Sequence, residues 1–249
     1  MEVHAHTHTA RKKWTHYLWE FLMLFLAVFC GFLAENQREH LSDRSKEKEY
    51  MRSMVQDLES DTAIDALSIQ FFTNVFKNVD TMLTCLKSDA PDPTIIHRII
   101  LRNFWTYGGY SYNNRTIEQL KNAGNFRLIQ NNAVADSILE FDNFMNTVLG
   151  QHITLLNSMI SYKEVEEKVI HYKELKQSGS SYMQMFDSSD FVHTNAPAFI
   201  SSDKELISLY YNKLFYHERL GHVFVRNLKD AVNRATRLLQ FIKKEYHLK

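Results

Sequence analysis

Residues 14–34 read WTHYLWEFLMLFLAVFCGFLA and are the most apolar stretch of this 249-residue chain. From residue 18 onward, Glu20 is the one charged residue in the stretch. A helix rises about 1.5 Å per residue, so 21 residues reach about 31 Å, and the hydrocarbon core of a bilayer is about 30 Å thick. Two tryptophans and a tyrosine stand at its N-terminal edge, where such rings favour the headgroup region. The stretch therefore predicts a single membrane-spanning helix.

Two other interpretations of this stretch stay open. A secretory signal peptide also has a basic start followed by an apolar core, and Arg11, Lys12 and Lys13 come directly before residue 14. The apolar run is long for such a peptide, however, and it ends without a clear small-x-small cleavage site. A buried core helix of a soluble protein is the third interpretation. We favour a retained anchor.

The basic residues around the stretch bear on its orientation. Three abut the N-terminal end, and four more lie within about 15 residues of the other end. These four are Arg38, Arg44, Lys46 and Lys48. Because the N-terminal charges are denser and closer, we expect the N-terminus inside the cell and the large domain outside it.

Composition limits the class of protein. Seven Gly and three Pro are few for this length and favour long helices with few tight turns. Lys and Arg together number 29, as do Asp and Glu, so no charge imbalance points to nucleic acid. Two cysteines provide neither a disulfide framework nor a metal-binding spacing. We expect no cofactor.

The rest of the chain reads as all-α, because apolar residues recur every three or four positions. We expect the first helix to continue from the span to about Lys87, through a polar neck that could also form a coiled-coil stalk. Together with the helices predicted after it, this first helix forms an up-and-down bundle of three long helices with two short ones packed on it. The predicted regions are a tail at 1–13, the span at 14–34, the neck at 35–49, and the bundle domain at 50–249, with a loop at 177–202.

A turn motif lies in the middle of the chain. Thr116 and Gln119 fit a capping box at the start of a short helix, and Gly124 fits its left-handed C-terminal cap. Leu120 lies on this helix, and Leu128 and Ile129 can fill the core before the next long helix opens at Asn131 or Asn132. We interpret the motif as a structural turn, with a ligand or partner site as the alternative.

This motif also carries a resemblance. Thr116, Leu120, Lys121, Ala123, Gly124, Leu128, Ile129 and Asn131 match the pattern of a recurring segment in a family of single-pass membrane proteins from Bacteroidota-type bacteria. Residues 15–40, THYLWEFLMLFLAVFCGFLAENQREH, resemble the anchor and neck of that family. The resemblance implies an inner-membrane protein with a helical domain, and it implies no specific activity.

Two groups of ionisable residues suggest chemistry. His4, His6 and His8 alternate and could bind a metal ion, but a solvated tail is the default for so short a tract. Glu20 lies inside the span, with His16 four residues earlier on the same helix face. A charge in a span is costly, so this pair could serve an ion path or join helices in an oligomer, or Glu20 could reach the interface.

No phosphate-binding loop, zinc-protease motif or nucleophile elbow occurs in the sequence. We therefore expect a non-enzymatic membrane-anchored domain for partner binding, scaffolding or sensing, with a lipid bilayer and a protein partner or second copy as its contacts. Tyr107, Tyr110, Tyr112 and the 177–202 loop are the predicted contact surface. The alternatives are an oligomeric channel or ion-coupled subunit that uses Glu20, and an enzyme with an unrecognised site.

Overall fold

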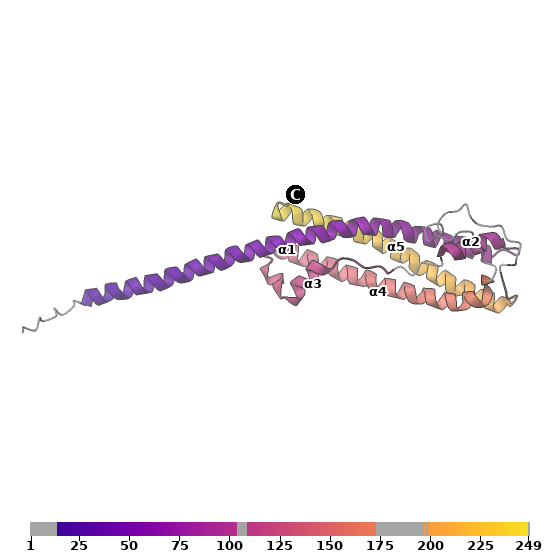
Figure 1. The fold of residues 1–249 in the computed structure, drawn as a ribbon, viewed down its shortest axis with the longest axis horizontal. Coiled ribbons are helices and arrows are strands. Elements are labelled where there is room, and N and C mark those ends of the chain that lie inside the picture. Colours follow the sequence, from indigo (N-terminus) through magenta and orange to yellow (C-terminus); the bar gives the residue numbers. More distant parts are fainter. Residues whose placement is uncertain (1–13, 104–108, 173–196, 198, 249) are drawn as a thin grey trace, which may run out of the picture. The chain divides into compact units, whose positions relative to one another are not determined.

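The computed structural model describes residues 14–103, 109–172, 197 and 199–248. The described residues are helical, and their one β-type contact is a single bridge between Ile170 and Phe199, so the all-α prediction is confirmed (Figure 1). The chain divides into two units, residues 1–50 and 51–249, which are described separately below. The elements are α1 (Trp14–Leu86), α2 (Pro93–Asn103), α3 (Arg115–Asn122), the 3₁₀ turn η1 (Asn125–Leu128), α4 (Asn132–Val169) and α5 (Lys204–Tyr246).

Local signals set the ends of most helices. No Gly or Pro occurs between Gly31 and Pro91, and α1 runs without a break to Leu86, as predicted. α2 begins with Pro93, whose missing N–H is not needed at that position. The Asp92 carboxylate caps this end by accepting a hydrogen bond from the Thr94 N–H at 2.8 Å.

The long helices α4 and α5 are capped by side chains as well. Asn131 accepts hydrogen bonds from the N–H groups of Ala133 and Val134, which confirms the predicted start of α4. The cap of α5 is Asp203. Asp203 accepts from the Glu205 N–H at 2.9 Å, because its carboxylate is the side chain placed at the first turn.

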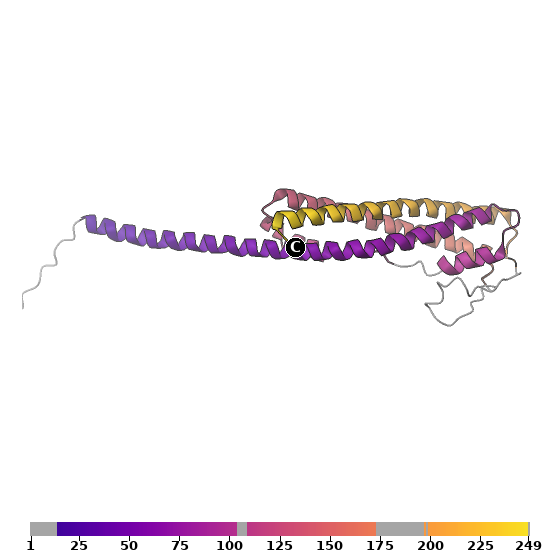
Figure 2. The ribbon, with the colours of Figure 1, turned by 90° about the horizontal axis from the view of Figure 1, so that it is seen from above.

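Three helices pack along one another in the unit of residues 51–249 (Figures 1 and 2). α5 is antiparallel to α4, since Glu140 pairs with Arg234 near the start of α4 and Glu166 pairs with Tyr210 near its end. α5 is also antiparallel to α1: Glu59 of α1 pairs with Lys243, and Phe72 contacts Phe224. α1 and α4 therefore run in the same direction.

This direction overturns the predicted up-and-down order. A helix that follows α1 in the same direction requires the chain to return along the bundle, and residues 109–114 are the last part of that return before α3 begins. Asn113 contacts Asp61 and Thr116 contacts Asp57, so this segment runs antiparallel to α1. We call residues 109–114 the return segment.

Large aromatic side chains fill the core between the three helices. Phe72 and Phe224 meet edge to face, with ring centroids 5.0 Å apart. Phe76 is fully buried and lies directly against Gly221 of α5. A Cβ atom added at Gly221 would lie 2.0 Å from the Phe76 ring, so this contact needs glycine. The packing thus depends on a small residue opposite a large one.

In the unit of residues 1–50, the apolar stretch of α1 is exposed along its whole length. It has a mean hydropathy of 2.0 over an eighteen-residue window, and none of that window is buried. The rings of Phe21, Phe25 and Phe29 stack along one side at i, i+4 spacing. α1 is therefore the one helix among the described residues that is long and apolar enough to cross a membrane.

Candidate functional site

His16 and Glu20 contact each other on the exposed apolar part of α1. His16 Nε2 lies 3.0 Å from Glu20 Oε1, and each side chain is about half exposed. The predicted placement on one helix face is thus observed. Any role of the pair in ion coupling or helix association stays a prediction, as does metal binding by His4, His6 and His8, which lie outside the described residues.

The predicted aromatic contact surface requires a correction. Tyr110 and Tyr112 each have an exposed fraction of 8%, so neither presents a surface for a partner. Tyr112 donates a hydrogen bond to Asp142 Oδ1 at 2.8 Å, and Tyr110 packs edge to face on Phe224. Both rings anchor the return segment in the core. Tyr107 lies outside the described residues, as does most of the 177–202 loop, which is described at residues 197 and 199–202.

The turn motif has the geometry of a structural turn. Gly124 adopts a left-handed conformation with φ of 62°, and Leu120, Leu128 and Ile129 are buried. The capping-box prediction is wrong, because α3 begins at Arg115 and the Thr116 hydroxyl does not cap it. That hydroxyl donates instead to Asp57 Oδ2. The motif thus holds α3 against α1.

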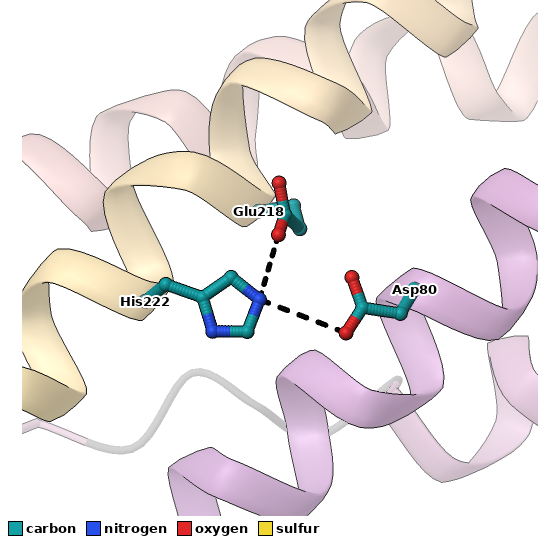
Figure 3. A group of neighbouring side chains, drawn as sticks. All are labelled: Asp80, Glu218 and His222. Carbon is teal, nitrogen blue, oxygen red and sulfur yellow. Dashed lines mark ion pairs between the residues drawn. The ribbon is translucent and has the colours of Figure 1, made fainter.

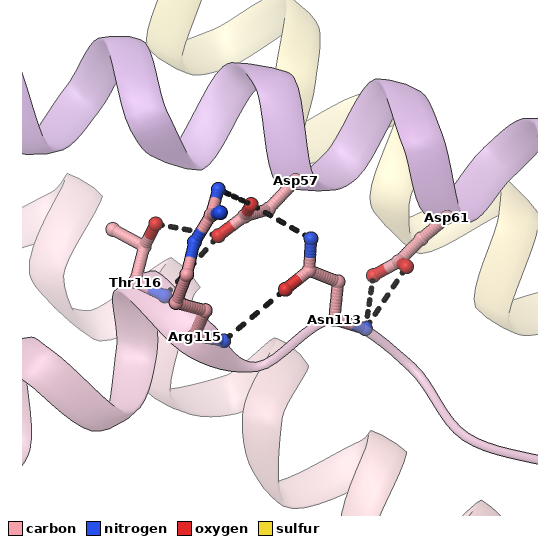
Figure 4. A network of polar contacts seen from close by, with 5 residues as sticks. All are labelled: Asp57, Asp61, Asn113, Arg115 and Thr116. Carbon is pink, nitrogen blue, oxygen red and sulfur yellow. Dashed lines mark hydrogen bonds and ion pairs between the residues drawn. The ribbon is translucent and has the colours of Figure 1, made fainter.

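Three buried aspartates follow one another along α1 at four-residue spacing, and we call them the aspartate ladder (Figure 4 shows two of them, with their partners). They are Asp57, Asp61 and Asp65, with exposed fractions of 2%, 5% and 3%. Sequence analysis did not single them out. A signal was present, because they interleave with the apolar stripe of α1 at helical spacing, but it does not reveal what they bind.

Asp57 is the most heavily bonded member of the ladder. Its Oδ2 accepts from the Thr116 N–H at 3.1 Å and from the Thr116 hydroxyl. Its Oδ1 accepts from Asn113 Nδ2 at 2.8 Å and from Arg115 Nη2 at 2.7 Å. One carboxylate therefore fixes both the return segment and the first turn of α3.

Asp61 and Asp65 continue the contact along the return segment. Both oxygens of Asp61 accept from the Asn113 N–H, at 2.9 and 3.0 Å. An extended segment packed on a helix leaves N–H groups without secondary-structure partners, and the ladder supplies acceptors for them. Burial raises the pKa of Asp61 and raises that of Asp65 to about 6, while the nearby Tyr110 hydroxyl opposes the rise at Asp65. Burial of these carboxylates is electrostatically unfavourable, and the hydrogen bonds that the ladder accepts order the return segment.

His217 and Ser158 form a buried pair that resembles a serine–histidine catalytic dyad. Ser158 Oγ lies 2.8 Å from His217 Nδ1, and Ser158 Oγ also lies 2.7 Å from the Leu155 carbonyl oxygen. A hydroxyl has one proton, so if it goes to Leu155 the histidine must donate to Ser158 and cannot act as its base. Burial lowers the pKa of His217 to about 4, which keeps the ring neutral in the core.

Glu166 collects hydrogen bonds at the far end of α4. It accepts from the hydroxyls of Tyr172 and Tyr210, the latter at 2.7 Å, and lies 3.4 Å from Lys163 Nζ. The adjoining cavity holds about 10 Å³, room for about one water molecule. Among the described residues, the group therefore satisfies a buried carboxyl group, and the cavity beside it has no room for more than a water molecule.

Asp80 of α1 meets Glu218 and His222 of α5 in a cluster that bridges the two helices (Figure 3). His222 Nε2 lies 2.6 Å from Glu218 Oε1 and 3.6 Å from Asp80 Oδ2. Among the described residues this is the group of ligand-type side chains with metal-compatible spacing. The sequence shows Glu218 and His222 at i, i+4, but it does not show that Asp80 joins them.

Two open pockets of about 240 Å³ each lie on the domain. One lies between α4 and α5, around Glu140, Phe141 and Arg234. The other lies beside the cluster of Asp80, Glu218 and His222, and is lined by Thr73, Phe76, His222, Val225, Arg226 and Lys229. Both are smaller than the roughly 300–1,000 Å³ usual for sites of drug-sized ligands.

Comparisons of the chain with protein-family models, with curated proteins and with solved structures find no match. The resemblance to a bacterial single-pass membrane family therefore stays a proposal.

Proposed function

We propose that this chain is a single-pass membrane protein, in which residues 14–34 anchor a non-enzymatic helical domain that binds or scaffolds a protein partner. One observation carries the proposal: a helical stretch of mean hydropathy 2.0 has no part buried within the chain. Apolar surface of this kind is costly in water, and lipid removes it from water. A helix also satisfies its own backbone hydrogen bonds, which a bilayer requires.

The domain offers more support for binding than for catalysis. Asp57 and Asp61 use their carboxylates to hold the return segment, and the Leu155 carbonyl oxygen competes with His217 for the single proton of the Ser158 hydroxyl. Among the described residues, the hydrogen bonds of the buried ionisable groups thus mainly stabilise the fold.

Cys30 gives a direct test of the anchor. It lies within the apolar stretch, and no other part of the described chain covers it. Lipid would therefore be what shields Cys30 from water. In native membranes we expect Cys30 to resist a water-soluble maleimide and to react once detergent and denaturant are added. Reaction of Cys30 in intact membranes, or a mature chain whose mass lacks residues 1–34, would reject the anchor in favour of a soluble helix or a cleaved leader.

We further propose that the N-terminus lies in the cytoplasm and the domain lies outside the inner membrane of a bacterium, in the periplasm. The dense basic residues before the span and the resemblance support this orientation. A Ser208→Cys variant in a background with Cys30→Ser and Cys85→Ser places a single label on exposed α5. Labelling by an impermeant reagent as soon as the outer membrane is opened is expected. Labelling that requires rupture of the inner membrane would reverse the topology.

Partner binding is tested on the intact chain extracted in detergent, by native mass measurement. We expect a complex of fixed stoichiometry, either with another protein or with a second copy. A chain that stays monomeric and unaccompanied across mild detergents and after cross-linking in native membranes would contradict the scaffold.

The His16–Glu20 contact at 3.0 Å favours one alternative, an oligomeric or ion-coupled subunit. In that case Glu20→Gln should lower oligomer stability or ion flux while the domain stays folded. Glu35→Gln is the matched control, because Glu35 lies just past the stretch and pairs with Arg38. Equal assembly and equal flux in wild type, Glu20→Gln and Glu35→Gln would remove this alternative.

A further inference from the structure

We propose that Asp80, Glu218 and His222 form a binding site for one divalent transition-metal ion of the Zn²⁺ class. Two carboxylates and an imidazole are ligands that Zn²⁺ takes readily. They come from two helices that are antiparallel neighbours, so a bound ion would link α1 to α5 (Figure 3). This inference goes beyond the proposed function and does not depend on membrane anchoring.

The distances suit a single ion after a small adjustment. One donor atom from each residue lies within 4.8 Å of the other two. Two atoms bound to the same Zn²⁺ at about 2.1 Å are at most about 4.2 Å apart. Two ligand atoms of a tetrahedral Zn²⁺ lie about 3.4 Å apart, so His222 Nε2 and Glu218 Oε1, at 2.6 Å, must separate by about 0.8 Å, whereas Asp80 Oδ2, at 3.6 Å from Nε2, is already in range. The side chains of Asp80 and His222 are each 49% exposed, so they are free to make this adjustment.

Glu218 supplies the second observation. Its side chain is 94% buried, being 6% exposed, and its Oε2 atom has no hydrogen-bond partner. Arg219 Nε lies 3.3 Å from Oε2, but not in the geometry of a hydrogen bond. Among the described residues, Oε2 thus pairs only with this largely exposed arginine, and the other oxygen, Oε1, faces His222 and the cluster, where a bound cation would further neutralise the buried carboxylate (Figure 3).

A plain ion pair explains the cluster less well. Nε2 of His222 carries at most one proton, so it can donate one hydrogen bond to the two carboxylates it faces. That bond fits Glu218 at 2.6 Å and leaves Asp80 at 3.6 Å. A dication binds both carboxylates and the ring together. The pocket of about 240 Å³ that His222 also lines has room for the water molecules that would complete the coordination.

The experiment uses the full chain in detergent, with His4, His6 and His8 replaced by Gln because that tract could bind the same metals. Zn²⁺ is titrated by calorimetry, and Co²⁺ is added as a spectroscopic probe of the ligand set. We expect one ion per chain, and at least a tenfold loss of affinity in both Asp80→Asn and His222→Gln. Asp230→Asn, an exposed acid on the same helix that pairs with Arg234, is the control and is expected to bind as the parent does.

Circular dichroism checks that each variant is folded. The side chains of Asp80 and His222 are equally exposed, at 49% each, so neither substitution is expected to unfold the domain. No saturable binding in the tail-substituted chain would overturn the proposal. So would binding that persists unchanged in folded Asp80→Asn and His222→Gln, since the ion would then sit elsewhere.

Discussion

Gly221 gives the sharpest test of how the helices pack. A Cβ atom there would meet three atoms of the Phe76 ring at 2.0, 2.1 and 2.3 Å. Ordinary contact begins at 3.4 Å, so the ring or the helix would have to move by about 1.4 Å, the difference between 3.4 and 2.0 Å. Phe76 is fully buried, with the rings of Phe72, His217 and His222 around it, so it has little room to move.

The expected cost of Gly221→Ala follows from two opposing effects. Overpacking a tight core costs about 1–3 kcal/mol. Replacing glycine by alanine within a helix returns about 0.5–1 kcal/mol. The overlap at 2.0 Å puts the overpacking cost in the upper part of its range, about 2–3 kcal/mol, so the net loss is about 1–2.5 kcal/mol. For a domain of roughly 200 residues each kcal/mol shifts Tm by about 2–4 °C, and we therefore expect Tm to fall by about 2–10 °C.

Gly150→Ala is the matched control, because Gly150 is also helical and an added Cβ meets nothing within 4 Å. It is expected to raise Tm by about 1–4 °C through helix propensity alone. Thermal unfolding of both variants is followed by circular dichroism with a chelator present, so that metal binding does not contribute. If Gly221→Ala is as stable as Gly150→Ala, the close contact between α1 and α5 is incorrect.

Three further predictions concern the return segment and its turn. Asp57→Asn replaces one of two acceptor oxygens by an NH₂ donor, so the bonds to Thr116 or those to Asn113 and Arg115 are lost, and the free energy of unfolding is expected to fall by about 2–4 kcal/mol. The exposed Glu59→Gln is expected to cost less than about 1 kcal/mol. Equal losses in denaturant titrations would contradict the role of Asp57 in holding the return segment. The pKa of Asp65 is raised from 3.8 to about 6 in the folded state, so the stability it contributes is present below pH 4 and is lost as the pH rises through 6. Asp65→Asn should remove this decline, up to about 3 kcal/mol at pH 7, and parallel pH profiles of wild type and variant would refute it. Gly124→Ala should cost about 1–2 kcal/mol because φ is 62°, and an unchanged unfolding midpoint would argue against the left-handed turn.

The sequence alone was sufficient for the elements whose causes are local. The uninterrupted run after Gly31 fixed α1 almost to its last residue, Asn131 marked the start of α4, and the density of apolar residues at 14–34 marked the candidate span. These features depend on propensity, capping and composition within a few residues, which a linear pattern contains.

Only the tertiary structure decided the direction of the long helices and the partners of the buried charges. The sequence did not single out Asp57 and Asp61, and it predicted Tyr110 as part of a contact surface. The burial of all three follows from the packing of the return segment against α1. Asp80 and Glu218 stand 138 positions apart (218 − 80) and meet because α1 and α5 are antiparallel. Such contacts depend on which faces pack together, and that choice is made by the whole core rather than by neighbouring residues.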